Sequence, residues 1–248
     1  MKIPLRVRLY LFAAIAIPAF AMPSVAQNNI RTILFVKVKM GQEDNWKSAV
    51  KDYVALDKKC GSKQSATVWD SQTGSPQHAI VWYSSKWKEM GEEDPAMKDS
   101  EVERARIFAR LDSVTESLEY WVDEMQPDMM VRSNDIPAMI RTSRTRVIPG
   151  KMDDVKALFR EQVLPAVKKS GASDFGVAVA RFGTPANEIH TYLGIKGWAD
   201  LDGAIGGQKG MTADEYKTFL AKLQPLIEST EWSIWKFEPE LSYLPASK

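Results

Sequence analysis

An internal repeat is the sequence feature that most constrains how this chain can fold. Four pairs of landmark residues recur at an offset that grows by one residue at a time: Gly41 and Gly150 (109 residues apart), Gly61 and Gly171 (110), Trp87 and Trp198 (111), and Pro127 and Pro239 (112). Single insertions in loops produce such a drift. Solenoid repeats have periods of roughly 20 to 50 residues, so we expect each of these much longer copies to be a folded domain.

Each copy predicts the same six elements from its apolar periodicity and its turn residues. In the first copy we expect strands at Thr32–Lys39, Ala66–Asp70, His78–Tyr83 and Glu119–Met125, with helices around Trp46–Val54 and over Ser100–Val114. In the second copy we expect strands at Arg141–Ile148, Val177–Phe182, Ile189–Ile195 and Glu231–Phe237, with helices around Val155–Val167 and over Thr212–Leu226. The strand segments are rich in β-branched residues, and the helical segments carry apolar residues three and four positions apart.

The resulting order, β-α-β-β-α-β, is that of the ferredoxin-like fold, an antiparallel sheet with both helices on one face. The predicted class is α+β, with two tandem ferredoxin-like modules at residues 27–133 and 134–248. The helix-free face of each sheet needs cover, and the sequence offers no third helical layer. We therefore expect the two modules to pack sheet to sheet.

Local signals predict how the helices begin and where one of them bends. Ser100 with Glu103, and Thr212 with Glu215, have the spacing of an N-terminal capping box. Pro165 lies inside the first helix of the second copy. Because proline has no backbone N–H, we expect a kink or a break at that point.

The first 26 residues have the organisation of a secretory signal. A basic segment (residues 2–8) precedes an apolar run (residues 9–20), and Ser24-Val25-Ala26 supplies small residues for cleavage after Ala26. The apolar run is shorter than the ~20 residues that span a bilayer, so we expect cleavage and not anchoring. The sequence thus predicts a periplasmic or secreted bacterial protein with no membrane association after cleavage.

Charge and cysteine content argue against several classes of protein. Lys and Arg number 33 against 32 Asp and Glu, so the basic excess typical of nucleic-acid binding is missing. Cys60 is the only cysteine, so no internal disulfide can form and the fold depends on its apolar core. The sequence also has no metal-ligand spacing, no Ser-His-Asp grouping and no phosphate-binding glycine loop. We predict no nucleic-acid partner, no metal and no cofactor.

The segment Ile80-Val-Trp-Tyr-Ser-Ser-Lys-Trp87 is an apolar strand that runs into a turn containing Trp and Ser. Together with the module order, it resembles the dimeric α/β-barrel superfamily and its antibiotic-biosynthesis-monooxygenase-like (ABM-like) members. The resemblance covers essentially the whole mature chain. It implies an intramolecular barrel of two fused modules, with a cavity between the helices and the sheet of each half. Haem-degrading members use a helix-borne His, which both second helices here lack, so that activity is not expected.

The first strand of the second copy carries the candidate ligand-binding residues. Because alternate side chains of a strand point to opposite faces, alignment with the first copy places Thr142, Arg144 and Arg146 on the face without helices. An unpaired buried guanidinium group costs several kcal/mol, so these groups need a carboxylate, water or an anionic ligand. We predict that Arg144 and Arg146, with Tyr192 beside them, bind a carboxylate or a similar anion. The alternative is that the arginines are solvated or paired within the protein.

His78 and His190 are the only histidines and the weak candidates for an acid–base catalyst. Each begins the third strand of its copy. Alignment of the two copies on Trp87 and Trp198 pairs His78 with Ile189, so the two imidazoles are expected on opposite faces of their sheets. The alternative for each is an ordinary hydrogen-bonded residue at the end of a strand.

These observations predict an exported protein that binds a small aromatic or carboxylated molecule. Two other functions stay open: an oxygenase or isomerase that needs no cofactor, and a non-catalytic structural or interaction protein. A homo-oligomer is compatible with any of them. The sequence does not decide whether the protein is an enzyme.

Overall fold

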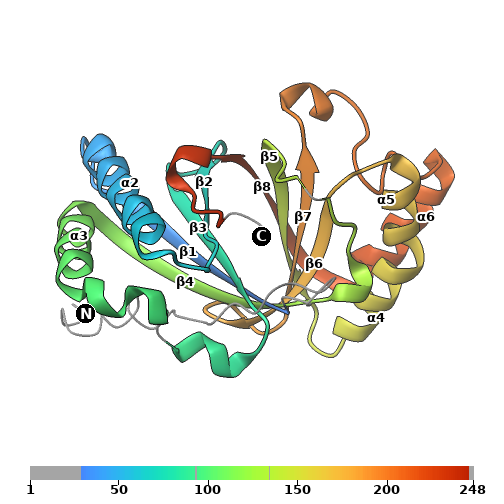
Figure 1. Cartoon of the computed structure of the whole chain (residues 1–248). Helices are drawn as coiled ribbons and strands as arrows, with labels where there is room; N and C mark the ends of the chain where they lie inside the picture. Colours follow the sequence, from blue (N-terminus) through green and yellow to red (C-terminus); the bar gives the residue numbers. More distant parts are fainter. Residues whose placement is uncertain (1–28, 93, 134, 246–248) are drawn as a thin grey trace. The chain divides into compact units, whose positions relative to one another are not determined.

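The computed structural model describes residues 29–92, 94–133 and 135–245 (Figure 1). The predicted signal segment, residues 1–26, lies outside the described residues. The chain divides into two compact units. The first comprises the residues up to Trp69, Gln77–Tyr120 and the residues from Glu238 on, and the second comprises Asp70–Pro76 and Trp121–Phe237.

The first unit has an antiparallel sheet with two helices on one face. Its elements are β1 (Ile30–Val38), α2 (Glu43–Cys60), β2 (Thr67–Ser71), β3 (His78–Ser84), α3 (Glu101–Val114) and the start of β4 (Thr115–Met125), with 3₁₀ helices at Trp87–Gly91 and Pro95–Ser100. The strand order is β1-β3-β2, and Leu34 lies opposite Ile80. Helices α2 and α3 lie side by side (Figure 1), and their apolar faces form a core with the sheet around Trp46 and Phe108.

The second unit repeats this arrangement. Its elements are β5 (Met139–Val147), α4 (Met152–Leu158), α5 (Leu164–Ser170), β6 (Phe175–Phe182), β7 (Glu188–Ile195), α6 (Ala213–Leu223) and β8 (Ile227–Phe237), with 3₁₀ helices at Pro127–Met129, Trp198–Leu201 and Gln224–Leu226. The strand order is β8-β5-β7-β6-β4, and neighbouring strands run antiparallel. The helices cover one face of this sheet (Figure 1), and a core that includes Phe159, Ile189 and Phe219 fills the space between them.

The α+β class and the order of the elements are confirmed over the described residues. The last strand of each half, β4 or β8, begins four residues earlier than predicted, at Thr115 and Ile227. β-branched Val114 and Thr115 favour extended backbone after α3. In the second unit Pro225 has no N–H with which to continue α6, so the helix ends before it.

One of the two capping boxes is confirmed and the other is wrong. Thr212 Oγ1 accepts a hydrogen bond from the backbone N–H of Glu215, whose side chain accepts from the N–H of Thr212. Ser100 instead donates its hydroxyl to the carbonyl of Met97. The chain before Ser100 is already a 3₁₀ helix that begins after Asp94, whose side chain caps it. Ser100 therefore sits inside a helical segment, where no free N–H group needs a cap.

The break predicted at Pro165 is a single π-helical turn. The turn, Phe159–Val163, separates α4 from α5. Pro165 follows it at the second position of α5 and offers no N–H to the carbonyl of Glu161. The wider turn lets the helix continue past the proline, and α5 ends at Gly171, which adopts a left-handed conformation with φ of 75°.

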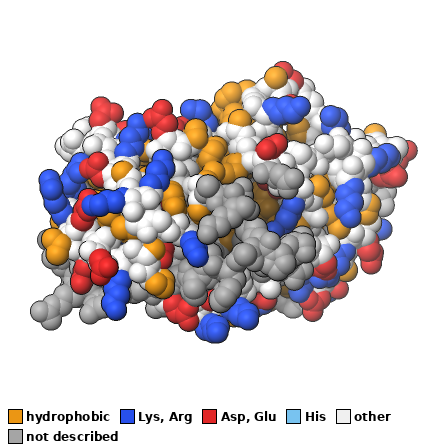
Figure 2. Space-filling view, in the orientation of Figure 1, with side chains coloured by type: hydrophobic (Ala, Val, Ile, Leu, Met, Phe, Trp, Pro, Cys, Tyr) orange, Lys and Arg blue, Asp and Glu red, His pale blue; other side chains and the backbone are white. Residues whose placement is uncertain are grey.

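Acidic and basic side chains are interspersed on the face of the molecule drawn in Figure 2. This agrees with the near balance of charge in the sequence. In the part of the chain that the structure describes, no helix combines the length and the apolar character that crossing a membrane requires.

Candidate functional site

The helix-free face of the second sheet carries most of the residues that the sequence singled out. On β5, Met139 and Val147 belong to the core beneath the helices, so Arg144 and Arg146 point the other way, as strand alternation predicts. Arg144 lies opposite His190 of β7, and Arg146 lies opposite Glu188. Residues directly opposite in an antiparallel pair share a face, so all four side chains lie together.

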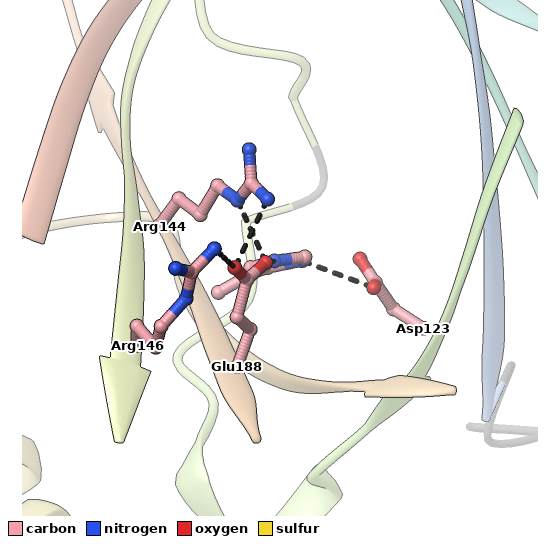
Figure 3. Close-up of polar contacts among 5 residues, drawn as sticks. Asp123, Arg144, Arg146 and Glu188 are labelled. Atoms are coloured by element: carbon pink, nitrogen blue, oxygen red, sulfur yellow. Dashed lines mark hydrogen bonds and ion pairs between the residues drawn. The ribbon is translucent and has the colours of Figure 1, made fainter. Parts of the chain in front are cut away.

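Glu188 is the centre of this group. Arg144 donates two hydrogen bonds to its carboxylate, from Nε to Oε2 (2.6 Å) and from Nη2 to Oε1 (2.9 Å). Arg146 adds one from Nη2 to Oε1 (3.2 Å). Figure 3 shows both arginines reaching from one strand toward Glu188, with Asp123 on the far side. The internal pairing that the sequence left as an alternative is therefore present for both arginines.

His190 extends the group to a second carboxylate. Its Nδ1 lies 3.0 Å from Oδ1 of Asp123, on β4, and its Nε2 lies 3.4 Å from Oε2 of Glu188. A neutral imidazole can donate from only one nitrogen, so both contacts are hydrogen bonds only when the ring carries two protons. The ring of Trp121 stacks on His190 and also lies 4.9 Å from the guanidinium carbon of Arg144. We call Asp123, Arg144, Arg146, Glu188 and His190 the charged network.

The network is buried at its acidic end and open at its basic end. Asp123 and Glu188 are inaccessible to solvent, whereas the side chains of Arg144 and Arg146 are 31% and 42% exposed. Burial would by itself raise the pKa of Glu188, but the hydrogen bonds from His190, Arg144 and Arg146 outweigh it and lower that pKa to about 2. Glu188 is thus ionised at neutral pH and holds the two guanidinium groups.

Tyr192 lies two residues along β7 from His190, on the same face and opposite Thr142. Its ring covers Gly176 of β6 so closely that a Cβ there would lie 2.3 Å from Cε1 of Tyr192. The structure therefore brings Arg144, Arg146, His190 and Tyr192 to one face of the sheet. Nε of Arg146 is buried and has no acceptor among the described residues, which leaves one donor of the network unused.

His78 belongs to the first unit and faces the helices there. Its ring stacks on that of Trp46 (centroids 3.9 Å apart), and its Nε2 lies 2.8 Å from Oε1 of Glu43. Both partners belong to α2. His78 and His190 therefore point to opposite faces of their sheets, and His78 is a packed, hydrogen-bonded residue at the end of a strand.

A cavity of about 100 Å³ lies between the helices and the sheet of the first unit. Apolar side chains from both helices and three strands make most of its wall, and a few polar side chains complete it. The lining residues include Leu34, Val54, Val68, Ile80, Trp82, Phe108 and Leu111, together with Asp57, Gln64, Tyr53 and Tyr243. We call this the first-unit cavity. It corresponds to one of the two cavities that the family resemblance implies.

Gln64 and Asp57 are two polar side chains in the wall of the first-unit cavity. Nε2 of Gln64 is buried without an acceptor among the described residues. Asp57, in the last turn of α2, is 7% exposed. Burial, and after it the nearby Asp94, raise the pKa of Asp57 to about 7. Asp57 can therefore gain or lose a proton near neutral pH inside an apolar cavity.

The sequence carried signals for two residues that the site prediction missed. Glu188 lies two residues before His190, so strand alternation puts it on the same face as the imidazole. Asp57 lies three residues after Val54 and four after Tyr53, which makes it a lone acid on the apolar stripe of its helix. No comparable signal marks Asp123, because its position depends on the pairing of β4 with β6.

Within the described ranges, no three His, Cys, Asp or Glu side chains are grouped so that they could hold a metal ion. Cys60, the last residue of α2, is a partly exposed free thiol.

Solved structures of other proteins share the fold of this chain. Neither a family model nor a curated protein sequence matches this chain. A proposed monooxygenase from Fusobacterium nucleatum matches with a TM-score of 0.58 at 16% identity, over 84% of this chain and 91% of that one. A proposed monooxygenase from Lactobacillus acidophilus gives 0.58 at 8% identity over 88% and 97%, and an anthrone oxidase-like protein gives 0.56 at 9% over 86% and 92%. These neighbours belong to the dimeric α/β-barrel superfamily, and the likeness shows that this chain has their fold.

Proposed function

We propose that this chain is an exported protein that binds a small aromatic molecule in the first-unit cavity. We further propose that its two halves, residues 27–133 and 134–248, are tandem ferredoxin-like modules of the ABM-like type. The repeated order of elements and the fold of the neighbours support the second proposal. The basic, apolar and small-residue segments before residue 27 support export to the periplasm or the outside.

The observation that carries the binding proposal is an apolar cavity with a buried, unsatisfied donor, Nε2 of Gln64, in its wall. Small-molecule sites combine apolar walls with a few polar groups that fix orientation. An apolar cavity of about 150 Å³ accepts benzene. The first-unit cavity, at about 100 Å³, is of the right order for a single ring if the side chains around it adjust.

Toluene is expected to bind the purified chain, and Leu111→Trp is expected to weaken that binding at least about tenfold. Leu111 lies on α3 and lines the cavity, so a larger side chain there occupies the ligand volume. Ligand-observed NMR and calorimetric titration measure the affinity. Val68→Phe fills the same space from β2 and serves if the first variant folds poorly.

Val102→Trp is the matched control, because Val102 lies on the same helix but is 86% exposed. It should leave toluene binding unchanged. Absence of toluene binding, or equal binding by both cavity variants and the control, favours the structural or interaction role that the sequence left open.

A carboxylated ligand is the second candidate, and the unused Nε of Arg146 favours it. Benzoate is expected to bind at the open end of the charged network, beside Arg144 and Tyr192, and Arg146→Met is expected to weaken that binding about tenfold. Arg141→Met is the control, since Arg141 lies on the same strand but packs on Trp232 at the other face. Benzoate affinity that is the same in both variants removes Arg146 from the proposal.

An oxygenase or isomerase that needs no cofactor remains the alternative function. It requires an enclosed pocket and one group that accepts a proton. Asp57 in the first-unit cavity supplies the group that accepts a proton, whereas His190 and His78 are held by carboxylates outside that cavity.

A further inference from the structure

The wall of the first-unit cavity has hydrogen-bonding capacity that the protein does not use. Gln64 lies in the segment after α2, where Gly61 turns the chain in a left-handed conformation. Its N–H₂ group is buried, and nothing in the described part of the chain accepts from it. Unsatisfied buried donors are rare because each costs free energy, so this one indicates a ligand or water that accepts from Gln64.

Asp57 lines the same cavity, and burial together with nearby Asp94 raises the pKa of its carboxyl group to about 7. The neighbouring carboxylate, Asp94, is already engaged: it accepts from the hydroxyl of Ser62 (2.6 Å) and from the N–H of Ala96 (2.9 Å). Of these two carboxyl groups, Asp57 is the one that lines the cavity.

The other titratable groups near Asp57 come from three elements. Tyr53 and Cys60 share its helix, Arg104 of α3 acts on Tyr53, and Tyr243 comes from the C-terminal segment. Burial raises the pKa of both tyrosines, so they stay neutral over the ordinary pH range. The hydroxyl of Tyr243 already donates to the carbonyl of Ser62 (2.6 Å). Asp57 is thus the group in this cavity whose charge changes near neutral pH.

We propose that Asp57 and Gln64 select a neutral ring compound with a hydroxyl or a carbonyl group, and that the protonation of Asp57 decides which of the two binds more tightly. This inference rests on the proposed function and deepens it. When Asp57 is neutral, its O–H and the N–H of Gln64 both donate to a carbonyl oxygen, which has two lone pairs. When Asp57 is ionised it only accepts, so a ligand hydroxyl donates to Asp57 and accepts from Gln64. A ligand carboxylate meets a like charge there and is excluded.

The test compares three probes of similar size: toluene, acetophenone and phenol. Affinities for the full chain are measured by calorimetry at about pH 5.5 and about pH 8.5, on either side of the titration of Asp57. The ratio of acetophenone to toluene affinity is expected to fall about tenfold from the lower to the higher pH, because ionised Asp57 cannot donate. The ratio of phenol to toluene affinity should not fall. Dividing by the toluene affinity removes any effect of pH on the protein that is common to all probes.

Asp57→Asn should make the acetophenone ratio independent of pH, since an amide does not titrate. Gln64→Leu should lower both ratios at both pH values and provides a second route if Asp57→Asn folds poorly. Asp52→Asn is the control on the same helix, because Asp52 is exposed and paired with Arg110. Both affinity ratios of Asp52→Asn should depend on pH as they do in the unchanged chain.

This inference is overturned if the ratio of acetophenone to toluene affinity is independent of pH in the unchanged chain, or if it still depends on pH in Asp57→Asn. In either case, binding of toluene still supports the proposed function. Failure of toluene to bind overturns the proposed function itself.

Discussion

Replacing Glu188 by leucine is expected to lower the free energy of unfolding at pH 7 by about 4 kcal/mol, because breaking a buried ion pair typically costs about 3–5 kcal/mol. The substitution removes the carboxylate that Arg144, Arg146 and His190 all contact. The guanidinium groups then stay partly buried without the carboxylate that both of them contact. Urea unfolding at equilibrium, followed by fluorescence, measures the loss.

Glu231→Leu is the control for this experiment. Glu231 lies opposite Arg144 on the other side of β5, but it is exposed, and exposed ion pairs contribute at most about 1 kcal/mol. The double variant Glu188→Leu, Arg144→Met should recover part of the stability, since it removes a partly buried charge that has lost Glu188. A loss below about 1 kcal/mol in Glu188→Leu would mean that the network does not support the fold.

Glu188→Leu is also expected to change how the stability of the protein depends on pH in the acid range. The pKa of Glu188 is lowered in the folded state, so its stabilising effect is fully present above the ordinary glutamate pKa and is lost as the pH falls through about 2. The unchanged chain should therefore lose stability more steeply than Glu188→Leu over that acid range.

Asp57→Asn is expected to raise the free energy of unfolding at pH 8 by about 2–4 kcal/mol while changing it little at pH 3. Folding raises the pKa of Asp57 to about 7, so the folded state binds a proton that the unfolded state has already lost between about pH 4 and pH 7. Stability of the unchanged chain therefore falls as the pH rises through this window, and it stays low above it. Asparagine has nearly the same shape and no charge to bury.

Unfolding curves at both pH values, for the unchanged chain and for Asp57→Asn, check this expectation. Asp52→Asn, on the exposed side of the same helix, should keep the pH dependence of the unchanged chain. Equal slopes of stability against pH in the unchanged chain and in Asp57→Asn would show that Asp57 is not the group responsible.

Much of the fold could be predicted because its helices and strands have patterns that are visible in short stretches of sequence. The alternation of β5 and the apolar stripe of α2 each depend only on neighbouring residues. Ser100 shows where this fails: its spacing from Glu103 fits a cap, but the preceding 3₁₀ helix removed the need for one. Whether a capping residue is used depends on the chain before it, which the motif does not contain.

The candidate sites were predicted less completely, for a related reason. That Arg144 must meet an anion followed from the cost of burying its charge. That the anion is Glu188 required the register of β5 against β7, and Asp123 required the pairing of β4 with β6. The first-unit cavity could be expected only from the family resemblance, because the size of a cavity depends on the positions of many side chains at once.

The wall of the first-unit cavity includes Leu241 and Tyr243, and Tyr243 is joined to Ser62 across 181 residues of sequence. Ala66 forms a β-bridge with Tyr243, and Lys51 pairs with Glu240. During synthesis the helices and strands around the cavity emerge long before these residues do. A nascent first half therefore exposes an unfinished apolar surface until the rest of the chain has been made, and binding of a ligand there must wait for translation, and for any export, to reach the closing segment.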